Sequence, residues 1–108
     1  MSLFIVRMEH PDGSIWNEYV LEHISYLKTL IENGKLLASG PLKNTPLRAG
    51  FLIFRASTRQ EVQDLINKDP FARENIISAL IIEEWDPLFG LLADESSKKS
   101  VLALARGN

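Results

Sequence analysis

One long amphipathic segment limits the folds open to this chain. Between Ile15 and Asn33 the apolar side chains recur every three or four residues, which predicts a helix with one apolar stripe. The stripe comprises Trp16, Tyr19, Val20, His23, Tyr26, Leu27, Leu30 and Ile31. Ser14 is the expected N-cap. Gly34 is the expected end, because glycine takes the left-handed conformation at no steric cost.

Strand-like segments lie on both sides of this helix. Rich in Val, Ile, Leu and Phe, they span residues 3–8, 35–39, 50–55 and 76–85. Gly40-Pro41 is expected to break the second strand. Thr58 and Glu61 match a capping box, which predicts a second helix as far as about Asn67. Asp69-Pro70 predicts another short helix, with the aspartate as cap and the proline in the first turn.

The order strand, helix, strand, strand, helix, strand is that of an α+β, ferredoxin-like βαββαβ subunit. Right-handed crossovers place both helices on one face of a four-stranded antiparallel sheet. The first, third and fourth strands are apolar on both faces, whereas strands with one solvated face should alternate. No segment remains to cover the second face. We therefore expect a homodimer through this open sheet face; the alternative is that bulky apolar strands tolerate exposure.

Composition narrows the function classes. The 108 residues suit one domain, and the net charge of −2 with pI near 5.6 and no basic block argues against nucleic-acid binding. No apolar run approaches the roughly 20 residues of a membrane span, and no signal peptide is recognisable. The absence of cysteine excludes disulfides, thiolate metal sites and a cysteine nucleophile, and is compatible with the expected cytoplasmic location.

Three side chains are candidates for chemistry. His10 follows the first strand in a turn and is expected to be solvated. His23 lies within the apolar stripe, where spacing alone favours a core histidine satisfied by a carboxylate or carbonyl. Spacing likewise favours Asp69 as a structural cap, although it could also orient His23 and stabilise its charged form. Two such ligands fall short of the three or four that zinc takes, so we expect no metal and no cofactor.

Four segments, taken together, resemble the YCII-related (YciI-like) family. Its pattern is a helical H-x-x-Y/F-L, a strand-ending A-G-P or S-G-P, a D-P-F or D-P-Y, and a closing W-x-P-x-F-G. The corresponding segments are His23-Ile24-Ser25-Tyr26-Leu27, Ala38-Ser39-Gly40-Pro41-Leu42, Asp69-Pro70-Phe71 and Trp85-Asp86-Pro87-Leu88-Phe89-Gly90. The resemblance defines a domain over 1–90 and leaves 91–108 as a C-terminal extension, expected to be a helical turn or disordered.

The resemblance implies a dimeric α/β barrel whose active site contains His23 and Asp69. Gly40 and Pro41 would border the pocket, and Ser39 would line it. One relative of this kind is a dehydrochlorinase of chloroaromatic compounds, and the broader group includes muconolactone isomerases and monooxygenases. Beside these residues, we expect Phe71 to supply part of an apolar substrate-binding wall.

Two functions remain open from the sequence. In the first, a lyase or isomerase uses His23 as general acid or base, oriented by Asp69, for elimination, isomerisation or dehydrochlorination of a small cyclic or aromatic molecule. In the second, the dimer is a non-catalytic small-ligand-binding or accessory protein. In either case we expect the apolar arm that contains Phe89, Leu91 and Leu92 to dock on the same or a partner subunit.

Overall fold

The computed structural model describes residues 1–96. Its elements are β1 (Ser2–Glu9), α1 (Ser14–Glu32), β2 (Leu36–Pro41), β3 (Ala49–Ala56), α2 (Arg59–Asn67), α3 (Pro70–Arg73), β4 (Ala79–Trp85) and the 3₁₀ turn η1 (Ala93–Glu95). The strands form one antiparallel sheet in the order β2-β3-β1-β4. The predicted ferredoxin-like α+β topology is confirmed. The expectation for residues 101–106, a helical turn or disorder, lies outside the described residues.

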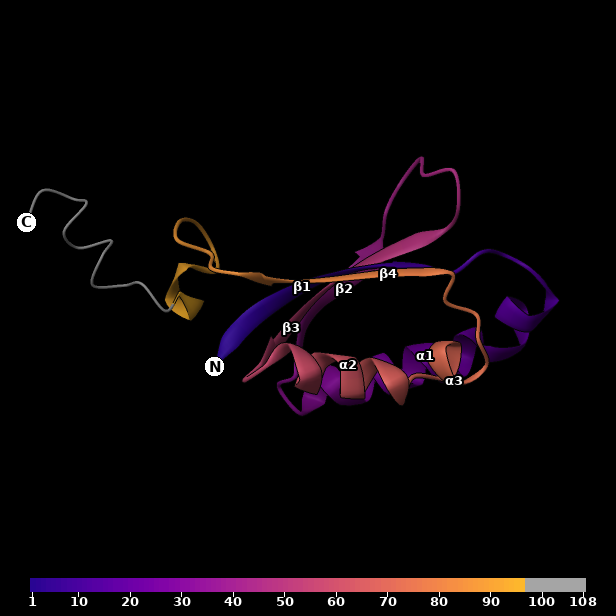
Figure 1. Ribbon diagram of the computed structural model, residues 1–108, viewed down its shortest axis with the longest axis horizontal. Helices are drawn as coiled ribbons and strands as arrows, with labels where there is room; N and C mark the ends of the chain where they lie inside the picture. Colours follow the sequence, from indigo (N-terminus) through magenta and orange to yellow (C-terminus); the bar gives the residue numbers. More distant parts are fainter. Residues whose placement is uncertain (97–108) are drawn as a thin grey trace, which may run out of the picture.

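The three helices lie on one side of the sheet, as Figure 1 shows. Alternate residues of β1 and β3 face them and form the core, as the period of two requires. This core contains Phe4, Val6, Met8, Leu52 and Phe54 from the sheet, with Leu30, Val62 and Ile66 from the helices. Burial of this apolar area is the main stabilising contribution to a domain of this size. Among residues 1–96, no helix combines the length and hydropathy that crossing a membrane requires.

The open face of the sheet carries charged as well as apolar side chains, so the expectation of strands that are apolar on both faces needs correction. Arg7 lies between Phe51 and Ile81 in the register, so these three side chains share that face. Phe51 and Ile81 are 36% and 52% exposed. Arg7 forms an ion pair with Glu9 at 3.0 Å. Charged side chains therefore alternate with apolar ones across this surface.

The predicted end of β2 was wrong. Gly40 and Pro41 belong to the strand and pair with Phe51 and Gly50 of β3. Because β2 is an edge strand, a proline without an N–H group can be accommodated there. Gly40 and Pro41 therefore have strand backbone and do not form a turn.

Two other boundaries differ from the sequence prediction. Ser14 is the first residue of α1 and not its N-cap. Gly13 occupies the N-cap position, where it has no side chain to accept a capping hydrogen bond. β4 begins at Ala79, three residues after the predicted Ile76. The amide of Ile76 instead donates to the carbonyl oxygen of Phe71, and Asn75 has a φ of 58°, so this segment closes α3.

The remaining helix ends agree with the sequence. Gly34 follows α1 with a φ of 75°, as its prediction required. Thr58 accepts a hydrogen bond from the Glu61 amide at 3.1 Å, and the Glu61 carboxylate accepts from the amide of Ser57. Each helix therefore begins or ends where the chain supplies partners for the free backbone groups.

The segment after β4 contacts β3 through an ion pair. Arg55 of β3 forms two hydrogen bonds with the Glu95 carboxylate, at 2.9 and 2.8 Å, and so fixes η1. Phe89 and Leu91 are nevertheless 75% and 99% exposed. Docking of these two side chains on their own subunit is therefore not observed, and docking on a partner stays a prediction.

Candidate active site

His23 and Asp69 meet although 46 positions separate them in the sequence. His23 lies midway along α1, and Asp69 immediately precedes α3, which packs beside α1. The imidazole Nδ1 is 2.7 Å from Oδ2 and 2.9 Å from Oδ1 of the carboxylate. Both residues are buried, Asp69 at 2% exposure. The two side chains expected to act together are in direct contact.

Asp69 also has the structural role that its sequence context favours. Its Oδ1 accepts a hydrogen bond from the Phe71 amide at 2.9 Å, and Pro70 occupies the first helical position. An ionised carboxylate only accepts hydrogen bonds, so the Nδ1 that faces it carries the proton. In neutral His23 the other ring nitrogen, Nε2, is then an acceptor.

Phe71 fixes the plane of the same imidazole. Its ring lies parallel to that of His23, with an interplanar angle of 3° and a centroid distance of 4.0 Å. The first turn of α3 thus supplies both the carboxylate that binds Nδ1 and the face against which His23 packs. Together these contacts leave His23 little freedom to rotate.

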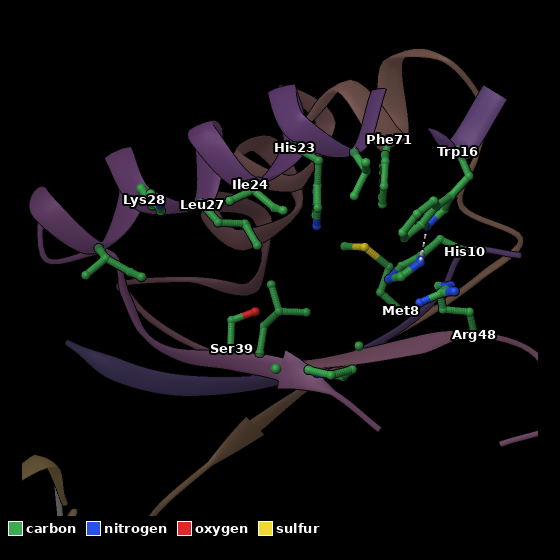
Figure 2. Close-up of a pocket in the computed structure, with 16 residues that line it drawn as sticks. Met8, His10, Trp16, His23, Ile24, Leu27, Lys28, Ser39, Arg48 and Phe71 are labelled. Carbon is green, nitrogen blue, oxygen red and sulfur yellow. Dashed lines mark hydrogen bonds between the residues drawn. The ribbon is translucent and has the colours of Figure 1, made fainter. Parts of the chain in front are cut away.

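A cavity of about 390 Å³ lies between α1 and the sheet. In Figure 2 the His23 side chain extends from α1 into it, with Ser39 on the opposite wall and Lys28 at one end. The lining residues expected from the sequence are His23, Ser39, Gly40, Pro41 and Phe71, and all of them border it. Asp69 lies behind His23, outside the lining. The remaining walls are largely apolar, formed by Met8, Val20, Ile24, Leu27, Ile31 and Leu52.

The aromatic residues of the α1 stripe divide between two roles. Trp16 borders the cavity. Tyr26 does not; its hydroxyl donates to the carbonyl oxygen of Leu65 on α2, and burial raises the pKa of this phenol. Trp16 and Phe71 therefore line this cavity, whereas Tyr19 and Tyr26 of the stripe do not.

His10 borders the same cavity, and the expectation that it is solvated was wrong. It is only 8% exposed, and its Nδ1 accepts a hydrogen bond from the indole Nε1 of Trp16 at 3.0 Å. Its ring centroid lies 5.0 Å from that of Phe71 and 6.0 Å from that of His23. Burial lowers the pKa of His10, and the positive charge of Arg48 acts in the same direction.

A signal for His10 was present in the sequence. Phe4, Val6 and Met8 alternate on the helix-facing side of β1, and one more step of two reaches position 10. The neighbouring turn signal Pro11-Asp12-Gly13 obscured this continuation. Strand periodicity extended past the end of the strand would therefore have identified His10 as an inward-facing residue.

Two loops close the cavity near His10. The guanidinium of Arg48 lies 4.3 Å from the centroid of the Trp16 ring, a distance typical of a cation–π contact. Arg48 also pairs with Asp12, with Nη2 to Oδ2 at 3.2 Å, and this hydrogen bonding lowers the pKa of Asp12. The backbone amide of His10 donates to the carbonyl oxygen of Arg48 at 2.9 Å. The contacts of Arg48 therefore join the β1–α1 and β2–β3 connections beside Trp16.

Metal ligands do not cluster here. Within residues 1–96, no group of three or more His, Asp or Glu side chains is arranged to hold a metal ion. The polar groups of the cavity are instead two imidazoles, a serine hydroxyl, a lysine and an arginine. Such a set suits proton transfer and hydrogen bonding to a small molecule.

Comparison with known proteins identifies the family of this chain. The model of the YCII-related domain matches residues 1–86. The chain belongs to the YCII-related family. No curated protein matches this YCII-related chain significantly.

One solved structure shares the fold and about a quarter of the aligned residues. The 5-chloro-2-hydroxyhydroquinone dehydrochlorinase of Burkholderia phenoliruptrix AC1100, solved with 2,5-dihydroxybenzoquinone, is 26% identical. The match covers 78% of this YCII-related chain and 93% of that enzyme, with a TM-score of 0.66. A dimeric ferredoxin-like protein of unknown function from Jannaschia sp. CCS1 is 16% identical over 80% of this chain and 99% of its own, with a TM-score of 0.47.

Proposed function

We propose that this YCII-related protein is a small-molecule enzyme in which His23 transfers a proton and Asp69 positions it. One observation carries the proposal: His23 is bound at Nδ1 by a buried carboxylate while its other nitrogen faces a cavity. In residues 1–96 every fully buried side-chain nitrogen or oxygen has a hydrogen-bond partner. Nε2 of His23 has none among these residues, so it is accessible from the cavity and free to accept a proton.

The chemistry that fits this arrangement is elimination or isomerisation. Nε2 of His23 takes a proton from the substrate, and the electron pair of the broken bond to hydrogen forms a new double bond. In an elimination, a group such as chloride leaves with the electron pair of its bond to carbon, so the net loss is HCl. In an isomerisation, the imidazolium returns the proton to another atom. Asp69 stabilises the imidazolium between these steps.

The walls of the cavity indicate the substrate class. Ile24, Leu27 and Phe71 provide apolar surface near His23, and Ser39 offers a hydroxyl across from them. A small ring with oxygen substituents matches this combination. The similar dehydrochlorinase acts on a chlorinated hydroxyhydroquinone. We therefore propose hydroxylated, chlorinated aromatic rings as the first substrates to test.

Turnover of a substrate panel tests the proposal. Chlorinated hydroquinones and lactones are incubated with the wild type, with His23→Gln and with Lys43→Ala, an exposed control outside the cavity. Loss of the general base should lower the rate at least ~100-fold in His23→Gln and leave the control unchanged. Full activity of a folded His23→Gln would refute the proposal. Ligand-induced shifts of melting temperature without turnover would favour the non-catalytic binding protein.

We also propose that two copies pair through the open sheet face. The supporting observation is the exposure of Phe51, Ile81 and Trp85 on that face, at 36%, 52% and 38%. Sedimentation equilibrium should give a dimer for the wild type and a monomer for Ile81→Glu, because a buried unpaired carboxylate would disfavour the interface. A monomeric wild type at all concentrations would exclude this pairing.

The domain limits 1–90 and 91–108 also stay predictions.

A further inference from the structure

The hydrogen bond from Trp16 determines which nitrogen of His10 carries the proton. An indole nitrogen can only donate, so Nδ1 of His10, 3.0 Å away, must be the acceptor and has no hydrogen. Burial favours the neutral form of the ring. A neutral imidazole without a proton on Nδ1 carries it on Nε2. His10 is therefore fixed as a hydrogen-bond donor at Nε2.

This donor is open to the cavity. Nε2 of His10 makes no hydrogen bond within residues 1–96, where every fully buried polar side-chain atom has one, so it is accessible. Gly50 lies next to it on β3. A Cβ at position 50 would be 3.4 Å from this nitrogen, an ordinary contact distance. The absence of a side chain at Gly50 therefore leaves space beside Nε2.

The two imidazoles of the cavity thus have opposite tautomers. His23 donates at Nδ1 to Asp69 and presents an acceptor, whereas His10 accepts at Nδ1 from Trp16 and presents a donor. Their ring centroids are 6.0 Å apart, and Phe71 lies against both rings. One small molecule can reach both nitrogens if it offers a proton to His23 and an oxygen lone pair to His10.

We propose that His10 donates a hydrogen bond from Nε2 to a ring oxygen, a carbonyl or phenolate, of the molecule bound in the cavity. When His23 removes a proton from a hydroxylated ring, the negative charge that develops spreads over the ring oxygens. A donor fixed in advance at one of these oxygens stabilises that charge without reorganisation. The binding role of His10 stands by itself; its role in the reaction rests on the proposed function of His23.

The contacts around Trp16 explain why the donor is held in place. Arg48 covers the indole ring at 4.3 Å and pairs with Asp12, and its carbonyl oxygen binds the backbone amide of His10. Arg48 thus contacts Trp16 through its side chain and His10 through its backbone, which holds the two rings relative to each other. Trp16 and Arg48 also line the cavity, whereas Asp12 does not; toward His10 all three are positioning residues.

Nuclear magnetic resonance tests the tautomers directly, with no substrate. Two-bond nitrogen–proton correlations in the full chain, labelled with 15N at histidine, should show His10 protonated at Nε2 alone and His23 protonated at Nδ1 alone. In Trp16→Phe the indole donor is lost while an aromatic ring remains, so His10 should become a mixture of both tautomers. Protonation of His10 at Nδ1 in the wild type would overturn the inference.

Ligand binding tests the role of the donor, with 2,5-dihydroxybenzoquinone as the probe. In calorimetric titrations His10→Phe, which keeps a flat ring but has no donor, should bind the probe about 10-fold to 100-fold more weakly than the wild type. His10→Gln retains an N–H group and should recover most of this loss. Equal affinity of wild type and a folded His10→Phe, or no binding of the probe by the wild type, would overturn the proposal.

Gly50→Ala keeps the proposal testable if His10→Phe fails to fold. Alanine fits the strand backbone at this position, so the variant should melt at or above the wild-type temperature. Its methyl group would partly cover Nε2 of His10 and should weaken probe binding, by no more than the loss expected for His10→Phe. Unchanged binding in Gly50→Ala would count against access of the ligand to His10.

These measurements separate the two proposals. Suppose that His10 is protonated at Nε2 and that His10→Phe binds the probe more weakly, but that no substrate is turned over. This result would support His10 as the hydrogen-bond donor and refute the proton transfer by His23. Turnover that depends on His23, together with a Nδ1-protonated His10, would do the reverse.

Discussion

Substitution of Asp69 by asparagine separates the two roles of this side chain. Oδ1 accepts from the Phe71 amide, so the asparagine oxygen must occupy this place to keep the cap. The amide nitrogen then replaces Oδ2, which lies 2.7 Å from Nδ1 of His23. Because this nitrogen donates and replaces the nearer of the two oxygens, we expect His23 to accept at Nδ1 and move its proton to Nε2; the competing arrangement keeps Nδ1–H on Oδ1, 2.9 Å away. The nitrogen that faces the cavity then no longer accepts a proton.

The magnitudes follow from these contacts. Asparagine caps a helix about as well as aspartate, so the free energy of unfolding should change by no more than about 1–2 kcal/mol. Asp69→Ala also removes the cap and leaves Nδ1–H without a partner, for a combined loss of about 2–4 kcal/mol. The proton-transfer rate of Asp69→Asn should fall about 10⁴-fold, the loss measured for the equivalent change in a serine protease triad.

Three measurements on the same sample check this reasoning. Urea unfolding gives the stability, nitrogen–proton correlations give the tautomer of His23, and chloride release from 5-chloro-2-hydroxyhydroquinone gives the rate. Asp69→Asn with a stable fold, a reversed tautomer and undiminished chloride release would refute the role of His23 as base. A folded variant that keeps the proton on Nδ1 would show that the cap oxygen accepts from both the Phe71 amide and His23, and would refute the expected tautomer reversal.

Three further predictions follow from the packing and the charges. Phe54 is 1% exposed and lies outside the cavity lining. Phe54→Ala should therefore lower the free energy of unfolding by about 3–5 kcal/mol and leave the ligand affinity of the folded fraction unchanged. Tyr26→Phe removes the bond to the Leu65 carbonyl oxygen and should cost about 0.5–1.5 kcal/mol in urea unfolding. Because burial lowers the pKa of His10 from 6.5, the unfolded chain binds a proton more readily than the native one, and stability should fall as the pH drops below about 6.5. Unfolding in His10→Gln should show a smaller acid-induced loss between about pH 7.5 and pH 5.5, and an equal loss would contradict the assignment.

The order of elements could be predicted because strong local signals mark it. Gly34 ends α1, Thr58 begins α2 and Asp69-Pro70 begins α3, each through a backbone requirement that one or two residues express. Gly40-Pro41 misled because the same dipeptide suits a turn and an edge strand. Only the position of β2 at the edge of the sheet distinguishes a strand from a turn here, and this position depends on the tertiary structure.

The site was only partly predictable. Spacing favoured a core histidine at His23 and a cap at Asp69, and their pairing was implied by the family resemblance. The structure brings both into contact, and the cap coexists with the pair. His10 was missed because the turn signal Pro11-Asp12-Gly13 hid the β1 alternation that reaches it, and because its contacts with Trp16 and Phe71 come from two other elements. Contacts of this kind have no periodic signature in the sequence.

The double use of α3 has a consequence for the tolerance of the chain to insertions. The carboxylate of Asp69 and the ring of Phe71 both belong to one rigid turn, joined to α2 by Lys68 alone. An added or deleted residue at this junction would rotate the whole turn, so the imidazole of His23 would lose its anchor and its stacking partner together. Homologous chains that keep this chemistry should therefore vary in length elsewhere, as in the β2–β3 hairpin, and keep the α2–α3 junction at constant length.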